Sequence, residues 1–374
     1  MDSPEPPRPS AALDGSSGGV LVVGAGIAGL ACALALREAG VPVTVVDRGR
    51  RPGGRMSGRR LHGRPVDLGA AYFTVPDATG PDATAPGGSS FAGVVADWTA
   101  RGLARGWTDT LTVLESGTSD TTTGPLRHAA PAGLRSLVGD LADTAGGAGA
   151  VLQIEHDVAE VHSDGTVRVE GAVPHGDPIR YDPIGHDPIR YDAVVLAMPE
   201  PQAARLLPAG SAMHAQLDVD AWEPVLSIAL GYPQRSWPAD LHGAFVNGSE
   251  LISFLADDGD RRGDDAPVLV AHTTADLARR HLDDPESAVP AVTAEVAALL
   301  GLDPADAPVW THAHRWTFAR ASSTHPEPYL LDGRLAVCGD AWGGRTSVAT
   351  AWESGHALGR TLGGSTGEAA TSRG

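Results

Sequence analysis

The sequence has 374 residues, enough for about two or three domains. Because 42% of them are hydrophobic, the chain can fill a core and is not a wholly disordered protein. The formal net charge of −18 argues against a general nucleic-acid binder and against a protein of anionic membrane surfaces. No apolar run reaches the ~18 residues that predict a membrane span.

Cysteine and lysine usage limits the chemistry further. The two cysteines, Cys32 and Cys338, imply neither a disulfide framework nor a cysteine-rich metal site. Both lie in apolar runs, so we expect buried, unreactive thiols. The chain has no lysine, which excludes a Schiff base and a lysine general base. Residues 1–18 lack the regions of a signal peptide, and we expect a disordered leader on a cytoplasmic protein.

A βαβ unit follows the leader. Val20–Val23 predicts a buried parallel strand, and Gly24–Gly29 predicts a tight turn. Leu30–Ala39 is rich in helix-forming residues, and Val43–Val46 predicts the second strand. The unit has the length expected of a nucleotide-binding start.

Loops and helices alternate after this unit. Arg48–Arg64 is rich in Arg and Gly and is interpreted as a loop, as is the polar segment Pro76–Ser90. Helices are predicted over Phe91–Ala104 and Gly133–Thr144. Val151–Glu170 indicates two strands around a turn.

The hexapeptide DPIRYD occurs twice, at Asp177–Asp182 and again at Asp187–Asp192. Repeat architectures need more copies than two. A longer surface loop costs little free energy. We therefore interpret the duplication as an insertion without function in a surface loop.

The remaining chain contains strands and helices in a different order. Ala193–Ala197 predicts a buried strand, and Val225–Thr274 contains several antiparallel strands. The later predicted elements are a helix at Ser287–Leu300, strands at Val309–Arg320 and Leu335–Cys338, and a helix at Ser347–Leu362.

The fold class expected from this order is a Rossmann-type α/β domain interleaved with an antiparallel-sheet (α+β) substrate domain. The cofactor domain is predicted to be discontinuous, comprising residues 19–75, 128–212 and 328–364. Residues 76–127 and 213–327 are assigned to the substrate domain, and residues 365–374 to a disordered tail.

The βαβ unit has the residues that a dinucleotide needs. Gly24 allows the turn, Gly26 leaves room for a pyrophosphate at the helix N-terminus, and Gly29 lets helix and strand pack closely. Asp47, 23 residues after Gly24, is placed to accept ribose hydroxyls. Ile27, Ala28 and Arg48 flank these positions and complete the expected contacts.

These residues alone do not decide between a nicotinamide and a flavin. Gly54 and Arg55 would bring backbone and a fixed cation to an anionic cofactor. Near the other end, Gly339-Asp340 offers a carboxylate for polyol hydroxyls. The helix that begins near Ser347 directs the positive end of its dipole at whatever group lies before its N-terminus. This would stabilise a reduced flavin, which carries negative charge.

Several segments together resemble the flavin-containing amine oxidase superfamily, with short motifs most similar to its renalase-like branch. These segments are Gly24–Gly29 with Asp47, Gly53–Arg55, Asp67–Phe73, His314–Trp316, and Gly339-Asp340 with Val348–Gly355. The resemblance covers most of Val20–Leu362 and implies bound FAD.

The resemblance also implies roles for individual residues. Gly54 and Arg55 would lie near the flavin and phosphates, as would the segment containing Gly69 and Ala70. Other implied contacts are Val158 with adenine, Asp340 with the ribityl chain or diphosphate, and Ser347-Val348 with the flavin pyrimidine edge. Since Cys338 is badly placed for the flavin ring, we expect the FAD to be non-covalent.

The substrate side departs from typical amine oxidases, which place a lysine near the flavin. We expect His314 and Trp316 to share one strand face over the flavin, with Arg315 or Arg320 nearby. An ordinary half-buried strand with surface histidines remains the alternative. Two histidines, His312 and His314, do not make a metal site without a third ligand, so no metal is expected.

Aromatic residues around the other motifs are further candidates. Tyr72 and Phe73 either approach the substrate or belong to the core. Trp342 and Arg345 are expected in loops beside the site, whereas Trp352 is expected to pack on the last helix.

The sequence and its resemblance therefore predict an FAD-dependent oxidase that takes a hydride from a small electron-rich donor. A dihydronicotinamide isomer is the donor that the renalase-like resemblance implies. Oxygen is the expected acceptor, with hydrogen peroxide as product, and neither nucleic acid nor membrane is an expected partner. Two alternatives stay open: an amine or amino-acid oxidase of specialised metabolism, and a non-catalytic flavin-binding protein.

Overall fold

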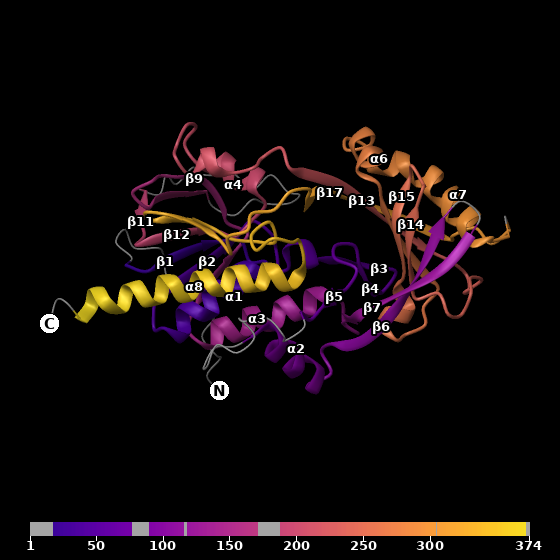
Figure 1. The fold of residues 1–374 in the computed structure, drawn as a ribbon, viewed down its shortest axis with the longest axis horizontal. Helices are drawn as coiled ribbons and strands as arrows, with labels where there is room; N and C mark the ends of the chain where they lie inside the picture. Colours follow the sequence, from indigo (N-terminus) through magenta and orange to yellow (C-terminus); the bar gives the residue numbers. More distant parts are fainter. Residues whose placement is uncertain (1–17, 77–89, 116–117, 171–187, 304, 372–374) are drawn as a thin grey trace, which may run out of the picture.

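The computed structural model describes residues 18–76, 90–115, 118–170, 188–303 and 305–371. Most of the predicted leader and of the 76–90 loop lies outside these residues, as does the first DPIRYD copy. The fold has two halves, one built on a mostly parallel sheet and one on a large mixed sheet (Figure 1).

The first half is organised around a six-stranded sheet in the order β18-β19-β12-β1-β2-β8. Its strands are β1 (Val20–Val23), β2 (Val43–Asp47), β8 (Val151–Ile154), β12 (Ala193–Leu196), β18 (Leu330–Asp332) and β19 (Leu335–Val337). All neighbours pair in parallel except β18 with β19. The sheet confirms the expected Rossmann-type domain, because the last segment of the chain returns to complete it.

Within the described part of the chain, four helices lie on one face of this sheet. They are α1 (Ile27–Glu38), α2 (Phe91–Ala100), α3 (Leu134–Gly147) and α8 (Val348–Thr371) (Figure 1). Helix α2 joins this core, since its Phe91 ring lies 5.9 Å from that of Trp352 on α8. Helix α8 also continues to Thr371, so the expected end near residue 362 was wrong.

The other face of the sheet is covered by a three-stranded sheet and a short helix. These are β9 (Asp157–Val161), β10 (Thr166–Glu170), β11 (Ile189–Arg190) and α4 (Glu200–Leu206). The two strands expected over residues 151–170 are thus three strands in two sheets. The second DPIRYD copy is also not a plain loop insertion: Ile189 pairs with Val167, and Ile189 and Tyr191 are buried. The fold therefore uses the second copy as a sheet edge.

The second half contains an eight-stranded sheet in the order β17-β13-β16-β15-β14-β6-β7-β5. Its strands are β5 (Phe73–Thr74), β6 (Arg105–Glu115), β7 (Thr118–Ala129), β13 (Trp222–Gly231), β14 (Gly243–Asn247), β15 (Ile252–Asp257), β16 (Val268–Thr273) and β17 (Trp310–Ala321). Only β14 and β6 pair in parallel. Helices α6 (Ala275–Arg280) and α7 (Val289–Leu300) pack on one face, which leaves the opposite face toward the first half (Figure 1).

A hairpin replaces much of the loop that was expected at Arg48–Arg64. After a single 3-10 turn (Gly54–Met56), β3 (Gly58–Leu61) pairs with β4 (Arg64–Asp67). His62 and Gly63 both have positive φ (46° and 84°), as the type I′ turn of a two-residue hairpin loop requires. The prediction was wrong because arginine-rich strands do not show an apolar alternation.

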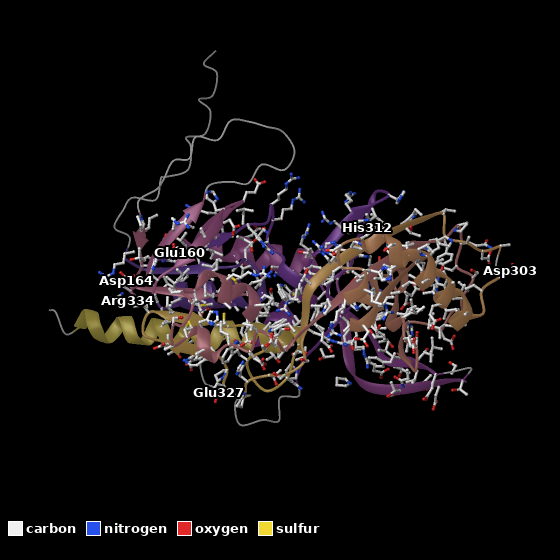
Figure 2. The ribbon with its side chains drawn as sticks, turned by 90° about the horizontal axis from the view of Figure 1, so that it is seen from above. Glu160, Asp164, Asp303, His312, Glu327 and Arg334 are labelled. Carbon is white, nitrogen blue, oxygen red and sulfur yellow. The ribbon has the colours of Figure 1, made fainter. Side chains whose placement is uncertain are left out.

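Buried ion pairs fasten the two halves together. Asp258 and Arg261 come from the short helix α5 (Asp258–Arg262), and Arg262 reaches Asp67 at 2.9 Å. Arg261 also donates to the backbone carbonyl oxygens of Asp67 and Ala71, both at 2.9 Å. The second half thereby holds the segment between Asp67 and Ala71 in place. Figure 2 shows Asp164 and Asp303 toward opposite ends of the molecule, with His312 between them.

Candidate functional site

A cavity of about 2140 Å³ lies between the two sheets. It is lined by the carboxyl ends of β1, β2, β12 and β19 and by side chains of β13, β15, β16 and β17. Ligands of open α/β sheets bind at the carboxyl ends of the strands. Since small-ligand pockets usually measure about 300–1,000 Å³, this cavity has room for a cofactor and a substrate together.

The glycines of the first turn divide into packing and cavity-lining positions. A Cβ on Gly29 would lie 2.0 Å from the Gly24 carbonyl oxygen, so Gly29 serves helix–strand packing and does not line the cavity. A Cβ on Gly26 would meet only Gly54 Cα, at 3.8 Å. Gly26 also gives α1 no side-chain cap. The helix N-terminus is therefore open for an anionic group, which fits the pyrophosphate of FAD.

Asp47 lies at the end of β2 and lines the cavity. Its carboxylate accepts hydrogen bonds from the backbone N–H groups of Ala25 (2.7 Å) and Gly49 (2.6 Å). These contacts tie the first turn to the second strand. They leave the remaining lone pairs of the carboxylate for ribose hydroxyls.

Arg55 and Asp340, which come from opposite ends of the chain, meet in the cavity wall. Arg55 Nη1 donates to Asp340 Oδ2 at 2.8 Å, and its guanidinium lies 5.1 Å from the ring centroid of Trp222. Trp222 is held by Glu200, which accepts from its indole N–H at 3.2 Å. The two predicted cofactor residues thus form one unit that is fixed by a buried carboxylate.

The last helix also begins at the cavity. Ser347 Oγ accepts from the Thr350 N–H at 2.9 Å, which caps α8. Ser347 and Val348 both line the cavity, so the positive end of the α8 dipole faces it. Gly69 and Ala70 lie beside Arg55, since the Ala70 N–H donates to the carbonyl oxygen of Arg55 at 2.9 Å.

The structure brings nearly all of the predicted residues to this one cavity. The lining includes Gly24, Gly26, Ile27, Ala28, Asp47, Arg48, Gly54, Arg55, Gly69, Ala70, Val158, His314, Arg315, Trp316, Gly339, Asp340, Arg345, Ser347 and Val348. Tyr72 and Phe73 line it as well, and Phe73 also packs in the core of the first half.

Trp342 is the exception among the predicted catalytic residues. It is buried, stacks on His325 at 3.9 Å between ring centroids, and does not line the cavity. The expectation that Trp342 is a site residue was therefore wrong, because the loop folds its ring inward. Trp352 is a packing residue as expected, stacked on His356 at 4.5 Å.

Two of the predicted cavity residues on strand β17, Trp316 and His314, are fixed by contacts with their neighbours. Trp316 Nε1 donates to the Leu68 carbonyl oxygen at 2.6 Å, which joins β17 to the Gly69-Ala70 segment. His314 packs edge-on against Trp316, with 4.6 Å between ring centroids. Burial, with help from nearby Arg59, lowers the pKa of His314 to about 4. The imidazole is consequently neutral at pH 7.

Sequence reasoning missed the residues that other strands contribute. They include Ser227 on β13, Phe245 on β14, Ser253 and Phe254 on β15, His272 on β16, and Arg59, Arg127 and Arg135. Side chains of β13, β15 and β16 alternate between the two faces of the sheet, as in any strand. The sequence of these strands does not indicate which of the two faces lines the cavity.

Two family models match the chain. Residues 81–357 match the model of the flavin containing amine oxidoreductase family, and residues 22–82 match an NAD(P)-binding Rossmann-like domain. The chain belongs to the flavin containing amine oxidoreductase family. Membership of this family supports an oxidoreductase activity with FAD as the cofactor. The open N-terminus of α1 fits the same cofactor.

Relatives with known names match either the whole fold or a short segment. Wild-type putrescine oxidase bound to putrescine aligns with a TM-score of 0.67 and 16% identity, covering 93% of this chain and 99% of that one. Cyclohexylamine oxidase from Brevibacterium oxydans IH-35A gives 0.65 and 14%, with the same coverage. Hydroxyneurosporene desaturase of Rubrivivax gelatinosus is 52% identical over 56 residues, which is 15% of this chain and 11% of the desaturase. The two structural likenesses establish the fold.

Among the described residues, no helix is both long enough and apolar enough to cross a membrane.

Proposed function

We propose that this FAD-dependent oxidoreductase takes a hydride from a small, electron-rich donor that carries no positive charge. A bound FAD supplies the hydride acceptor, and oxygen is proposed to take the two electrons onward, giving hydrogen peroxide. The chain's own residues hold the cofactor, orient the donor and exclude water. A dihydronicotinamide isomer, as the renalase-like motifs imply, is the donor that we propose first.

The charge of the cavity carries this proposal. Among the described residues, eleven arginines and four aspartates line it. Arg55 is paired with Asp340, but Arg51, Arg59 and Arg135 form no ion pair with a carboxylate in the described part of the chain. A positive potential of this kind repels the ammonium form in which most amines exist at pH 7. It favours neutral donors and donors with phosphate or carboxylate groups.

An amine or amino-acid oxidase is the second candidate. The family match and the likeness to putrescine oxidase and cyclohexylamine oxidase favour it. It would require the arginines to be neutralised by an anionic part of the substrate, as the carboxylate of an amino acid could do.

We further propose that the FAD is held without a covalent bond. Neither Cys32 nor Cys338 lines the cavity, and both are buried. Burial raises the pKa of the Cys338 thiol to about 12, so the nucleophilic thiolate is not formed at neutral pH. Denaturation in acid is expected to release all of the flavin into the supernatant.

Anaerobic reduction of the purified yellow protein tests the choice of donor. Reduced nicotinamide isomers are expected to bleach the flavin absorbance, whereas putrescine and cyclohexylamine are not. Arg59→Ala is expected to raise the apparent KM for a phosphate-bearing dihydronicotinamide more than that for its N-methyl analogue, which has no phosphate. Bleaching by amines alone would move the assignment to the second candidate, and a flavin that no donor reduces would favour a non-catalytic protein.

A further inference from the structure

Three polar side chains form a continuous row across the sheet face that lines the cavity. His314 on β17 is the register partner of Ser227 on β13, and Ser227 is the register partner of His272 on β16. Directly opposed residues of antiparallel strands have Cβ atoms about 4.5–5.5 Å apart and point to the same side. All three line the cavity. The row is therefore a polar strip that faces the substrate space.

Ser227 gives this strip a hydroxyl without a protein hydrogen-bond partner. Its side chain is fully buried by the protein, yet its hydroxyl has no hydrogen-bond partner among the described residues. A buried hydroxyl without a partner costs about 1–3 kcal/mol. Ser253, a neighbouring cavity residue, differs because its hydroxyl donates to the backbone carbonyl oxygens of His272 (3.3 Å) and Thr273 (3.1 Å). Only Ser227 of these two hydroxyls is free for a ligand.

Aromatic rings continue the same row toward the other side of the sheet. Phe254 is the register partner of His272, and Phe245 that of Phe254. The ring centroids of Phe254 and His272 lie 6.0 Å apart, and those of Phe245 and Phe254 lie 5.6 Å apart. Tyr72 packs on Phe254 at 5.9 Å. One wall of the cavity is thus polar at one end and aromatic at the other.

The two imidazoles of the row are neutral at pH 7. Burial lowers the pKa of both His272 and His314 to about 4. Arginines face each ring and act in the same direction: Arg261 and Arg320 for His272, and Arg59, Arg135 and Arg315, together with His312, for His314. A neutral imidazole offers one N–H donor and one acceptor nitrogen. The row therefore presents donors and acceptors without a charge.

We propose that His314, Ser227 and His272 bind a carboxamide group carried on a ring of the substrate, with the ring against Phe254, Phe245 and Tyr72. This inference rests on the proposed function for the site, and it names the recognised group. A carboxamide has an acceptor oxygen and donor hydrogens, which match the hydroxyl and the two neutral imidazoles. Ser227 is a specificity-determining residue in this arrangement, and it takes no part in the redox step.

Calorimetric titration of the oxidised holoenzyme with benzamide tests carboxamide binding by this row of residues, and it does not require turnover. Benzamide is expected to bind, and benzylamine, which has the same ring with a cationic group, is expected to bind at least about tenfold more weakly. Ser227→Ala is expected to raise the benzamide Kd about tenfold, since it removes one hydrogen bond to a buried acceptor. Ser253→Ala is the matched control and is expected to leave the Kd within about twofold, because its hydroxyl is already bonded to the backbone.

A second pair of variants keeps the inference testable if Ser227→Ala loses FAD. His272→Leu removes both ring nitrogens and is expected to weaken benzamide about tenfold, whereas His272→Gln keeps a donor and an acceptor and is expected to restore most of the affinity. If wild type, Ser227→Ala and His272→Leu bound benzamide equally well, the proposed carboxamide site would be refuted, even if a dihydronicotinamide reduced the flavin. Binding that depends on Ser227 in a protein that no dihydronicotinamide reduces would support the row and refute the proposed donor.

Discussion

Asp258 is a position where replacing one carboxylate oxygen with an amide NH2 should strongly lower stability. Arg64, Arg261 and Arg262 all donate to its carboxylate, with Arg64 Nη1 at 2.6 Å, Arg261 Nε at 2.9 Å and Arg262 Nε at 3.0 Å. Asp258 and Arg261 have no exposed surface. Asp258→Asn keeps the shape of the side chain but leaves these guanidinium groups without their shared negative charge.

The expected loss in the free energy of unfolding is about 3–5 kcal/mol, the range for breaking a buried ion pair from one side. The matched control is Asp276→Asn. Asp276 pairs with Arg279 at 2.6 Å with the same i,i+3 spacing as Asp258 and Arg261, but the side chains are 79% and 51% exposed. An exposed pair contributes about 0–1 kcal/mol, so the control should lose about 0.5 kcal/mol at most.

Urea denaturation of the FAD-loaded protein, followed by tryptophan fluorescence, measures both variants. Since the same network holds the Asp67–Ala71 segment beside the cavity, flavin release should shift with the unfolding midpoint in Asp258→Asn. If Asp258→Asn and Asp276→Asn lost the same free energy, burial of the charges would not be what makes the network stabilising.

Acid adds a second check on the same residue. Although burial opposes ionisation, the three arginines lower the pKa of Asp258 to about 2. A lowered pKa means that the carboxylate stabilises the fold above its unfolded pKa of about 3.9, and that this stabilisation is lost as the pH falls toward 2. The advantage of wild type over Asp258→Asn should therefore shrink between about pH 4 and pH 2.

Two further predictions concern the cofactor turn and the histidine row. Gly26→Ala should fold normally but bind FAD at least about tenfold more weakly, because its Cβ would project into the cradle. Gly29→Ala should also destabilise the apoprotein, since its Cβ would collide with the Gly24 carbonyl oxygen. Flavin content and apoprotein unfolding separate the two, and equal effects on both readouts would contradict this division. The lowered pKa of His272 means that its protonation favours the unfolded chain, so stability should fall as the pH drops from about 6.5 to about 4. His272→Gln should flatten this part of the stability profile, and an unchanged profile would show that His272 does not titrate in this way.

Much of the cofactor half could be predicted because its signals are local. The glycines of the first turn, the strand before them and Asp47 after the second strand lie within a short stretch of chain. Each of these residues acts on backbone close to it in sequence, at a turn, at the start of a helix or at the end of a strand. The β3–β4 hairpin is just as local, but it was missed because its strands are arginine-rich and its turn, His62-Gly63, is not a common turn pair.

The substrate wall could not be predicted in the same way. Ser227, His272 and Phe254 are separated by many residues, and each is unremarkable within its own strand. They become one surface only through the register of β13, β15 and β16. A shift of one residue in any of these strands would turn the side chain to the other face.

The sequence by itself determined the Rossmann-type start and most of the residues at that end of the cavity, because backbone turns and helix ends depend on adjacent residues, and its resemblance to a known family indicated the flavin. The tertiary structure decided that Trp342 turns inward, that Arg55 and Asp340 pair, and that a polar row continues into aromatic rings. Those outcomes depend on long-range strand register and on the burial of charge, which are properties of the packed chain and not of any segment alone.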